Sequence, residues 1–313
     1  MKVVMVNDCA FVGETLFKYM PTDMEKQHIK RTRGLWSKTF GLAYNILKAK
    51  GDVYHAHYLL QDCYITARLG KSPLVGHAHG SDLRVSLSHP LWGRIVRHNL
   101  KKCDKILVST PDVLGTAKKF REDVEYIPNP IDNEYFYPKP NAPHQGKKRV
   151  FIGSDCNFNV KGTDITIRAL SRIRDKVEVS ILKYGPDFNK TVALASSLDL
   201  YLNILPKVSH QKLNEYYWNA DVVIDRIKLG SLGLVSLEAI ACGRPVVTYV
   251  SSEFQQYTTF PLKDVDTEEE VVEAIENADD QLWEKEHEYL RKEHRTEAIV
   301  ERLMRIYDSL RRC

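Results

Sequence analysis

Short apolar runs alternate with longer amphipathic segments along this chain, and this rhythm constrains the fold more than any other feature. In roughly the first 130 residues the apolar runs occupy 2–6, 52–58, 73–79 and 105–110, and helical segments follow from Gly13, over 60–69, over 90–100 and up to Phe120. Apolar runs of strand length between helices predict parallel strands that are buried on both faces. The sequence therefore predicts a doubly wound α/β sheet here.

The rhythm stops in a proline-rich stretch and then starts again. Residues 127–149 contain five prolines, and each proline disfavours helix in the residue before it. Beyond it, strand-like runs at 149–154, 177–185, 221–225 and 245–250 alternate with helical segments at 162–173, 209–218 and 234–242. We expect two Rossmann-like domains that face a central cleft, residues 1–140 and 141–290, and a helix at 291–313 that packs back towards the first domain.

The composition disfavours several classes of protein. Lys and Arg number 45 against 41 Asp and Glu, a formal net charge of only +4, so a nucleic-acid partner is not indicated. The six cysteines form no CxxC pair, which favours reduced thiols over a disulfide framework or a zinc site. The apolar run at the start is too short for a signal peptide, and no later stretch approaches ~18 apolar residues. We expect a cytoplasmic protein, soluble or peripherally bound at the inner face of the membrane.

The segment GSLGLVSLEAIACGRPVV, residues 230–247, directly follows the strand-like run DVVID. Gly230 and Gly233 allow a tight turn, and the helix after them presents the amides of Leu234 and Val235 to an anion. A phosphate group is the expected ligand. A glycine turn before a helix is also an ordinary α/β connection, so the spacing alone leaves both interpretations open.

This segment resembles the donor-binding signature of the retaining family 4 glycosyltransferases of the GT-B fold. Glu238 matches the second glutamate of a Glu-x7-Glu pair, which in that family holds the ribose hydroxyls of the nucleotide. Gly230 stands where the family has the first glutamate, the residue that touches the donor sugar. Asp225, at the end of DVVID, is the candidate substitute, and the alternative is that it only caps a loop.

A second match is NVKGTDITIRAL, where Lys161 and Gly162 precede a predicted helix. It resembles the family element whose lysine contacts the donor diphosphate. The arginine that the family usually places a few residues earlier is missing, so either fewer cations meet the diphosphate or Arg226 or Lys228 supplies that charge. A solvated lysine at a helix start is the alternative. The resemblance also puts Tyr184, at the end of a strand-like run, where family members seat the base.

In the first half, PLVGHAHGSDLR resembles the family's HGSD turn and places His79, Gly80 and Asp82 at a strand end. The resemblance implies that His79 hydrogen-bonds the donor, and a core histidine bonded to backbone is the alternative. His55 and His57 share one strand face, as do His77 and His79, but no third ligand stands at a diagnostic spacing for a metal. Gly13, in the turn from Asn7 to Glu14, is a weaker candidate for close approach to a ligand.

Two basic segments and one acidic pair complete the candidates. Residues 26–38 and 91–102 read as basic amphipathic helices, which could lie on an anionic membrane or be ordinary surface helices. The pair Asp264 and Asp266 precedes a glutamate run and reads as a solvated helix start, not as a metal-binding DxD element.

The resemblance implies a metal-independent, retaining glycosyltransferase that moves a sugar from a nucleotide-diphosphate sugar to a hydroxyl acceptor, such as a lipid-linked glycan, a polysaccharide or a small molecule. The alternatives are a catalytically silent sugar-nucleotide-binding subunit and a GT-B-like sugar epimerase or phosphorylase. No cofactor is expected beyond the donor. The predicted site residues are His79, Asp225 and Glu238 for catalysis, Lys161, Tyr184, Arg226, Gly230, Ser231, Gly233, Leu234, Val235 and Glu238 for the donor, and Gly13, Gly80 and Asp82 on the acceptor side.

Overall fold

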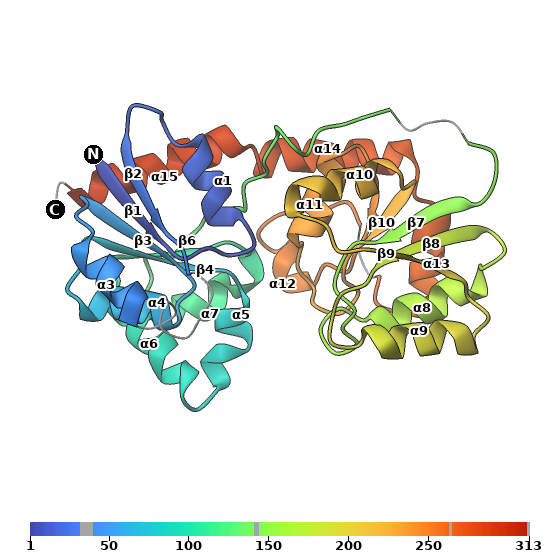
Figure 1. The fold of residues 1–313 in the computed structure, drawn as a ribbon, viewed down its shortest axis with the longest axis horizontal. Helices are drawn as coiled ribbons and strands as arrows, with labels where there is room; N and C mark the ends of the chain where they lie inside the picture. The colour runs from blue at the N-terminus through green and yellow to red at the C-terminus, as the bar shows by residue number, and fades with distance from the viewer. Residues whose placement is uncertain (32–39, 141–143, 263–264, 312–313) are drawn as a thin grey trace. The chain divides into compact units, whose positions relative to one another are not determined.

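The computed structural model describes residues 1–31, 40–140, 144–262 and 265–311 (Figure 1). It divides the chain into two compact units. Unit 1 comprises Met1–Pro130 and His294–Cys313, and unit 2 comprises Ile131–Glu293. The chain therefore leaves unit 1, forms the whole of unit 2, and returns to unit 1 with its last helix.

Unit 1 contains a six-stranded parallel sheet in the order β2-β1-β3-β4-β5-β6. The strands are β1 Lys2–Val6, β2 Glu25–Ile29, β3 Val53–His57, β4 Leu74–Ala78, β5 Lys105–Val108 and β6 Glu125–Tyr126. One face is covered by α1 (Val12–Tyr19) and α15 (Thr296–Arg311), and the other by α3 (Phe40–Lys48), α4 (Gln61–Arg68) and α6 (Trp92–Lys102) (Figure 1). The short helices α5 (Ser81–Arg84) and α7 (Leu114–Lys118) follow β4 and β5.

Unit 2 contains a five-stranded parallel sheet in the order β11-β10-β7-β8-β9. The strands are β7 Lys148–Ile152, β8 Val177–Leu182, β9 Leu202–Leu205, β10 Val222–Ile224 and β11 Val246–Val247. α8 (Thr163–Arg172), α9 (Phe188–Ser197) and α13 (Glu268–Glu276) lie on one face, and α10 (Leu213–Trp218), α11 (Leu234–Ala241) and α14 (Asp280–Glu293) on the other (Figure 1). α12 (Ser252–Gln255) is a single short turn after β11.

The strands of unit 2 are buried on both faces. Val150 and Ile152 of β7 pack in one apolar cluster with residues of α8 and α13. Phe151, between them, packs in a second cluster with residues of α11 and α14. Because neighbouring residues of a strand point to opposite faces, this division shows that helices cover both sides of the sheet. The prediction of two doubly wound parallel sheets is confirmed, and the central cleft stays a prediction.

The divisions between the units fall after Pro130 and after Glu293, whereas the sequence predicted domain limits at 140 and 290. Packing explains the first difference, because Ile131 and Phe136 lie in the apolar core of unit 2. The proline-rich stretch is therefore largely a part of unit 2.

One predicted helix is wrong, two elements were not predicted, and one predicted helix begins differently. Glu25–Ile29, the start of the basic segment 26–38, forms the edge strand β2, and residues 32–39 lie outside the described residues. The residues of β2 alternate between exposed and partly buried up to the buried Ile29, and the first four are polar, so a search for apolar runs misses this edge strand. β9 and α9 were not predicted, and the helix predicted at 209–218 begins as the 3-10 turn His210–Lys212.

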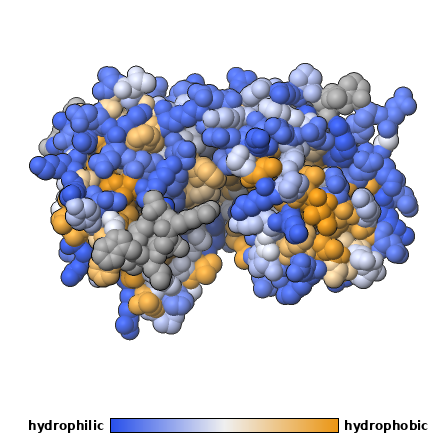
Figure 2. Space-filling view, in the orientation of Figure 1, coloured by the Kyte–Doolittle hydropathy of each residue, from blue (hydrophilic) through white to orange (hydrophobic). Residues whose placement is uncertain are grey.

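The described helices include none that is both long enough and apolar enough to cross a membrane. On the face shown in Figure 2, hydrophilic residues interrupt the hydrophobic areas of each unit.

Candidate functional site

Four histidines of unit 1 form two hydrogen-bonded pairs, one above the other. His55 Nε2 lies 3.2 Å from His77 Nδ1, and His57 Nδ1 lies 3.0 Å from His79 Nε2. Between the pairs, the rings of His55 and His57 are stacked with centroids 4.6 Å apart, and those of His77 and His79 are tilted with centroids 4.4 Å apart. β3 supplies His55 and His57, β4 supplies His77, which is the register partner of His57, and His79 follows β4.

The pairs are almost closed off from solvent. His55, His57 and His77 are buried, and the Tyr307 hydroxyl of α15 lies 2.5 Å from His55 Nδ1. Burial lowers the pKa of His77 to about 3, and burial followed by the neighbouring imidazoles lowers the pKa of His55 and His57 well below the ordinary value. The imidazoles are therefore neutral near pH 7. Within each pair, one N–H donates the hydrogen bond and the facing ring nitrogen accepts it.

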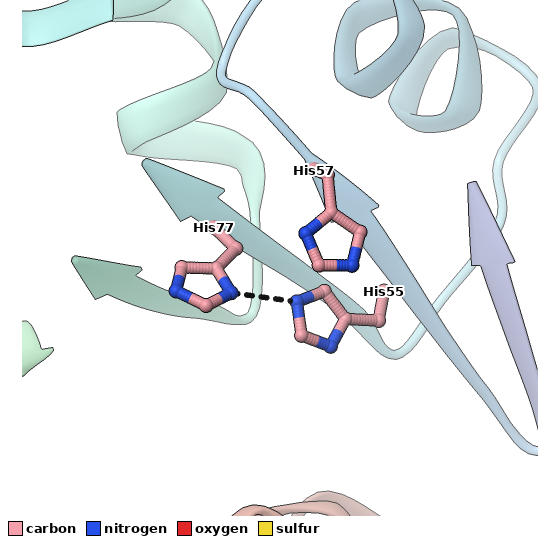
Figure 3. A group of neighbouring side chains, drawn as sticks. All are labelled: His55, His57 and His77. Atoms are coloured by element: carbon pink, nitrogen blue, oxygen red, sulfur yellow. Dashed lines mark hydrogen bonds between the residues drawn. The ribbon is translucent and has the colours of Figure 1, made fainter. Parts of the chain in front are cut away.

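Figure 3 shows the three buried rings, which place one nitrogen each within 4.8 Å of one another. A zinc ion binds an imidazole in the plane of the ring at about 2.0–2.1 Å. The planes of His55 and His57 are only 16° from parallel and are stacked, so one ion cannot lie in both planes. The ring geometry favours a hydrogen-bonded cluster over a metal site, and the absence of a metal cofactor stays a prediction.

The predicted acceptor-side residues surround this cluster. Gly80 has φ +99° and begins α5, and the Asp82 carboxylate accepts hydrogen bonds from the backbone amides of Leu59 at 3.0 Å and His79 at 3.2 Å. Asp82 is fully buried, so it shapes the turn that carries His79 and presents no surface of its own. A Cβ at Gly13 would lie 2.8 Å from His57 Nε2, so the close approach there is made by the histidine ring.

In unit 2, a charged cluster lies where β10 ends and α11 begins. Asp225 Oδ2 accepts hydrogen bonds from Ser236 Oγ at 2.8 Å and from Arg226 Nε at 3.2 Å. A Cβ at Gly233 would collide with the guanidinium of Arg226, so this glycine gives Arg226 its place over the start of α11. Burial opposes ionisation of Asp225, but the charges of Arg226 and Lys161 hold its pKa below the ordinary value.

Lys161 belongs to the same cluster. Burial and the charge of Arg226 lower its pKa, while Asp225 and Asp155 act against that shift. Its ammonium lies 3.6 Å from an Asp155 oxygen, and 15% of the Lys161 side chain is exposed to solvent. Gly233 caps α11 with no side-chain hydrogen bond among the described residues, so the first amides of the helix, Leu234 and Val235 included, add their positive potential to that of two cations.

The backbone conformation of Gly230 explains why no glutamate stands at this position. It has φ +71°, a conformation that L side chains rarely adopt, and a Cβ there would lie 2.8 Å from Ser251 Cβ. The turn is thus built around a glycine, with Ser231 fully buried behind it. A glutamate at this position would require another backbone path.

Glu238 lies within α11 and is held by two residues that the sequence did not single out. Its Oε1 lies 2.6 Å from His210 Nε2, and its Oε2 accepts a hydrogen bond from the Tyr217 hydroxyl at 3.1 Å. Burial raises the pKa of the carboxyl, and both hydrogen bonds oppose the rise. These contacts join residues 28 and 21 positions apart, so no local spacing could have predicted them.

Tyr184 lines an open pocket of about 530 Å³ at the end of β8. The pocket is bounded by Asp155, Lys183, Tyr184, Gly185, Pro186, Phe188 and Asn189. The Lys207 ammonium lies 4.0 Å from the centre of the Tyr184 ring. Asp155 belongs both to this pocket and to the ion pair with Lys161, so the predicted base site and the charged cluster are neighbours.

The remaining candidates lie elsewhere. In α6, Val96 and Leu100 are buried in the core of unit 1, while Arg94, Arg97, Lys101 and Lys102 face outwards. This is the pattern of an ordinary surface helix, and membrane contact is not shown. Asp266 precedes Thr267, which caps α13 in a capping box with Glu270, and Asp264 lies outside the described residues.

The structure thus brings Lys161, Asp225 and Arg226 together at the start of α11, with Tyr184 in a neighbouring pocket, and Glu238 contacts His210 and Tyr217. The predicted acceptor-side residues lie around the histidine cluster of unit 1. Asp225 exposes none of its side chain, so it acts on neighbours and touches no ligand in this conformation. His210, Tyr217 and Ser236 are the residues that sequence reasoning missed.

Two family models match the chain. One, described as glycosyl transferases group 1, matches residues 146–280, and the other, described as glycosyltransferase family 4, matches residues 24–135. Each model therefore matches most of one unit.

Curated relatives are distant. The chain is 24% identical over 215 residues to the N-acetyl-alpha-D-glucosaminyl L-malate synthase of Bacillus anthracis, which covers 63% of this chain and 56% of that protein. It is 26% identical over 235 residues to the D-inositol 3-phosphate glycosyltransferase of Kineococcus radiotolerans, which covers 63% of this chain and 53% of that protein. The chain spans about half the length of these relatives.

Solved structures share the fold. The sucrose-phosphate synthase of Thermosynechococcus elongatus matches with a TM-score of 0.77 at 15% identity, covering 99% of both chains. The HepE protein of Anabaena, in complex with UDP and glucose, matches with a TM-score of 0.78 at 13% identity, covering 99% of this chain and 100% of that one. At these identities the likeness concerns the fold alone.

Proposed function

The chain belongs to family 4 of the glycosyltransferases, and we propose that it moves a sugar from a nucleotide-diphosphate sugar to a hydroxyl acceptor with retention of anomeric configuration. The observation that carries this proposal is the charged cluster of unit 2. Lys161 and Arg226 lie with one buried carboxylate, Asp225, at the positive end of α11, so this region has the charge that suits a diphosphate.

The chemistry needs negative charge to be stabilised as the diphosphate leaves. Lys161, the Arg226 guanidinium and the first amides of α11 are arranged before the reaction, so little reorganisation is required. Asp225 orients Arg226, and Asp155 competes with the diphosphate for Lys161. The described cations supply this charge themselves, which supports transfer without a metal. The acceptor hydroxyl would then attack from the face that the sugar leaves.

Names of similar proteins support the substrate class. One curated relative is named as an L-malate synthase and several as D-inositol 3-phosphate glycosyltransferases, and both names imply small acceptors that carry hydroxyl groups. The HepE structure contains UDP and glucose. We propose a UDP- or GDP-type donor and leave the acceptor among small molecules, polysaccharides and lipid-linked glycans.

The cellular location is part of the proposal. We expect the protein in the cytoplasm, with the outward basic residues of α6 as the candidate contact with the anionic inner face of the membrane.

A second function, a catalytically silent sugar-nucleotide-binding subunit, is favoured by one observation. Gly230 stands where the family has the glutamate that touches the sugar, and its backbone conformation and its contact with Ser251 disfavour any side chain there. Such a subunit would bind the donor but neither hydrolyse nor transfer its sugar.

A panel of UDP-, GDP- and ADP-sugars tests both functions. We expect one of them to raise the Tm of the protein in proportion to its occupancy, and to be consumed when acceptors such as inositol phosphate or malate are supplied. Binding without any consumption would favour the silent subunit. A panel in which no nucleotide sugar changes the Tm of the wild type would contradict both.

A further inference from the structure

The connection between α5 and α6, here called the tip (residues 85–91), carries the two most exposed large aliphatic side chains of the described residues. Val85 is 64% exposed and Leu91 is 58% exposed. In Figure 1 this connection projects beyond the rest of unit 1 at its lower edge. Two apolar side chains held in water at one projecting point are unfavourable by themselves, so the tip is a candidate contact surface.

The tip is held in one conformation by its own contacts. The His89 imidazole accepts hydrogen bonds at Nδ1 from the backbone amides of Leu91 at 3.2 Å and Trp92 at 3.3 Å. A Cβ at Gly93 would lie 2.3 Å from the Leu87 carbonyl oxygen, so α6 can approach the tip this closely only with glycine at that position. Because the turn is already ordered, bringing it into a contact costs little conformational entropy.

The helix that follows the tip carries positive charge only. Residues 83–103 contain no Asp or Glu, although the whole chain has 41 of them. The exposed cations of α6 are Arg94, Arg97, Lys101 and Lys102. Leu91, Arg94 and Lys101 follow one another at intervals of three and seven residues, which places them on one helix face. The apolar tip and the basic face of α6 therefore point the same way.

The neighbouring elements add no exposed carboxylate to this surface among the described residues. Asp62, on α4 beside α6, is only 2% exposed. Asp112, near the base of the tip, is paired with Arg84 at 2.7 Å. Asp104 follows the far end of α6, where it accepts a hydrogen bond from the Leu74 amide at 2.7 Å. The surface from the tip along α6 is therefore positive.

An anionic bilayer matches both features of this surface. Its headgroups attract Lys and Arg, and its interfacial region accepts apolar side chains. A nucleic acid would match the cations, but surfaces that bind single strands use aromatic side chains on which bases stack, not exposed aliphatic ones. A symmetric contact with a second copy would bring the cations of two α6 helices together. The charge and the apolar tip together favour the bilayer.

We propose that Val85 and Leu91 insert into the surface of an anionic bilayer while the cations of α6 contact its headgroups. This inference rests on the membrane location proposed above and adds the element that inserts. Only the single helical turn α5 separates the tip from the turn that carries His79. Docking through the tip therefore holds the predicted acceptor side of unit 1 close to the membrane.

Co-sedimentation of the full chain with vesicles tests the insertion. The vesicles contain equal amounts of phosphatidylglycerol and phosphatidylcholine, and vesicles of phosphatidylcholine alone are the neutral control. We expect the wild type to bind the anionic vesicles at least about tenfold more tightly. Val85→Ser combined with Leu91→Ser should weaken this binding about tenfold, because two apolar side chains no longer enter the bilayer. Tyr201→Ser, which changes a side chain of unit 2 that is 84% exposed, should have no effect.

Charge variants measure the contact with the headgroups. Arg94→Gln combined with Lys101→Gln should weaken binding about 30-fold, since each cation near an anionic surface contributes about fivefold. Arg168→Gln combined with Arg174→Gln removes two exposed cations from unit 2 and should change binding less than about twofold. All of these side chains are exposed, so the Tm should stay unchanged. If the serine pair does not fold, Leu91→Gln replaces it, with an expected loss of about threefold.

The outcomes separate the bilayer from the other occupants. If the wild type binds neither kind of vesicle, binds both equally, or keeps its affinity with the serine pair, the inference is wrong. A dimer seen by light scattering that the serine pair dissociates would assign the tip to a second copy. Tighter binding to a single-stranded oligonucleotide than to the anionic vesicles would assign α6 to a nucleic acid.

The proposed sugar transfer is tested separately, because the nucleotide-sugar panel is measured without vesicles. A protein that consumes a donor but binds no vesicle keeps the transfer function and loses the docking. A protein that binds the anionic vesicles while no nucleotide sugar changes its Tm keeps the docking and contradicts the transfer function.

Discussion

The two units share one architecture and both bury carboxylates, but a cluster of hydrogen-bonded histidines lies in unit 1, whereas a buried carboxylate of unit 2 lies beside Arg226. Unit 1 buries histidines that bond to one another and stay neutral. Unit 2 buries carboxylates, among them Asp225 and Glu238, next to cations and an imidazole. The difference teaches that the fold does not determine the charge of a site. The strand ends determine where side chains lie, and the residue types decide whether those side chains form a neutral network or a charged site.

The contrast follows from where the polar residues stand. In unit 1 three of the histidines lie within β3 and β4, where a charge would have no water near it. In unit 2 Asp225 and Arg226 directly follow β10, at the carboxyl end of the sheet where ligands of such sheets bind, and Glu238 lies within α11.

The largest expected effect is an acid-induced loss of stability confined to unit 1. An unfolded histidine binds a proton below its ordinary pKa of 6.5, whereas folded His77 does so only near 3, so the unfolded state gains protons first and stability falls with pH. From pH 7 to pH 5 this costs about 2 kcal/mol for His77 alone. His55 and His57 act in the same direction. Hydrogen exchange of the β3 and β4 amides measures it.

Unit 2 provides the internal control for this experiment. Burial raises the pKa of Glu286 well above its ordinary value, so its folded form keeps a proton that the unfolded form releases, and acidification favours folding there. Exchange in β10 and β11 should therefore not accelerate between pH 7 and pH 5. His77→Asn should reduce the response of unit 1 without abolishing it, because His55 and His57 remain, and equal acceleration in both units would remove the contrast.

The next effect concerns nucleotide binding. Lys161→Met should weaken the binding of a nucleoside diphosphate roughly 30- to 100-fold, about 2–3 kcal/mol, because a charge-assisted contact is lost. Calorimetry measures the affinity. Lys228→Met is the matched control, since that lysine is more exposed and pairs with Asp164, and it should change affinity far less. The reverse order would assign the diphosphate to Lys228.

Gly233→Ala should have an intermediate effect. The new Cβ collides with the Arg226 guanidinium and with Oδ2 of the buried Asp225, so both members of this ion pair must shift, although the backbone φ of −95° accepts alanine. We expect about tenfold weaker nucleotide binding, about 1.4 kcal/mol, together with a lower Tm because a buried ion pair is disturbed. Unaltered affinity would show that Arg226 does not face the diphosphate.

Asp155→Asn should act in the opposite direction. It removes the carboxylate that competes for Lys161, so nucleotide affinity should rise about threefold. Weaker binding in the same calorimetric titration would instead give Asp155 a direct part in holding the ligand.

The smallest expected effect is that of metal removal. Since the stacked rings of His55 and His57 cannot share one ion, EDTA should leave the Tm and the transfer rate unchanged, and added zinc should not raise the Tm. A zinc-dependent rise that His55→Asn abolishes would turn the neutral cluster of unit 1 into a metal site.

The sequence predicted those parts of the molecule that depend on local pattern. The apolar runs located β1, β3, β4 and β5, and the glycine turn located α11, because burial on both faces and helix starts leave local signals. β2 and β9 were hidden because edge strands are partly exposed and need no continuous apolar run.

The predicted site residues, by contrast, could be named but not oriented. Tyr307 meets His55 across 252 positions, and His210 meets Glu238 across 28, so only tertiary packing reveals either pair. The sequence likewise could not show that position 230 disfavours a glutamate. That follows from the backbone φ of Gly230 and from its contact with Ser251.

The return of α15 to unit 1 has a consequence for biosynthesis. Unit 2 is continuous in the chain, whereas unit 1 needs Tyr307 beside His55 to close its histidine network. On the ribosome, the half that is translated first is therefore completed last, after an entire domain has emerged between its two pieces. Until then the imidazoles of unit 1 lack the cover of α15. A nascent chain stalled before α15 would therefore carry a complete unit 2 and an incomplete unit 1.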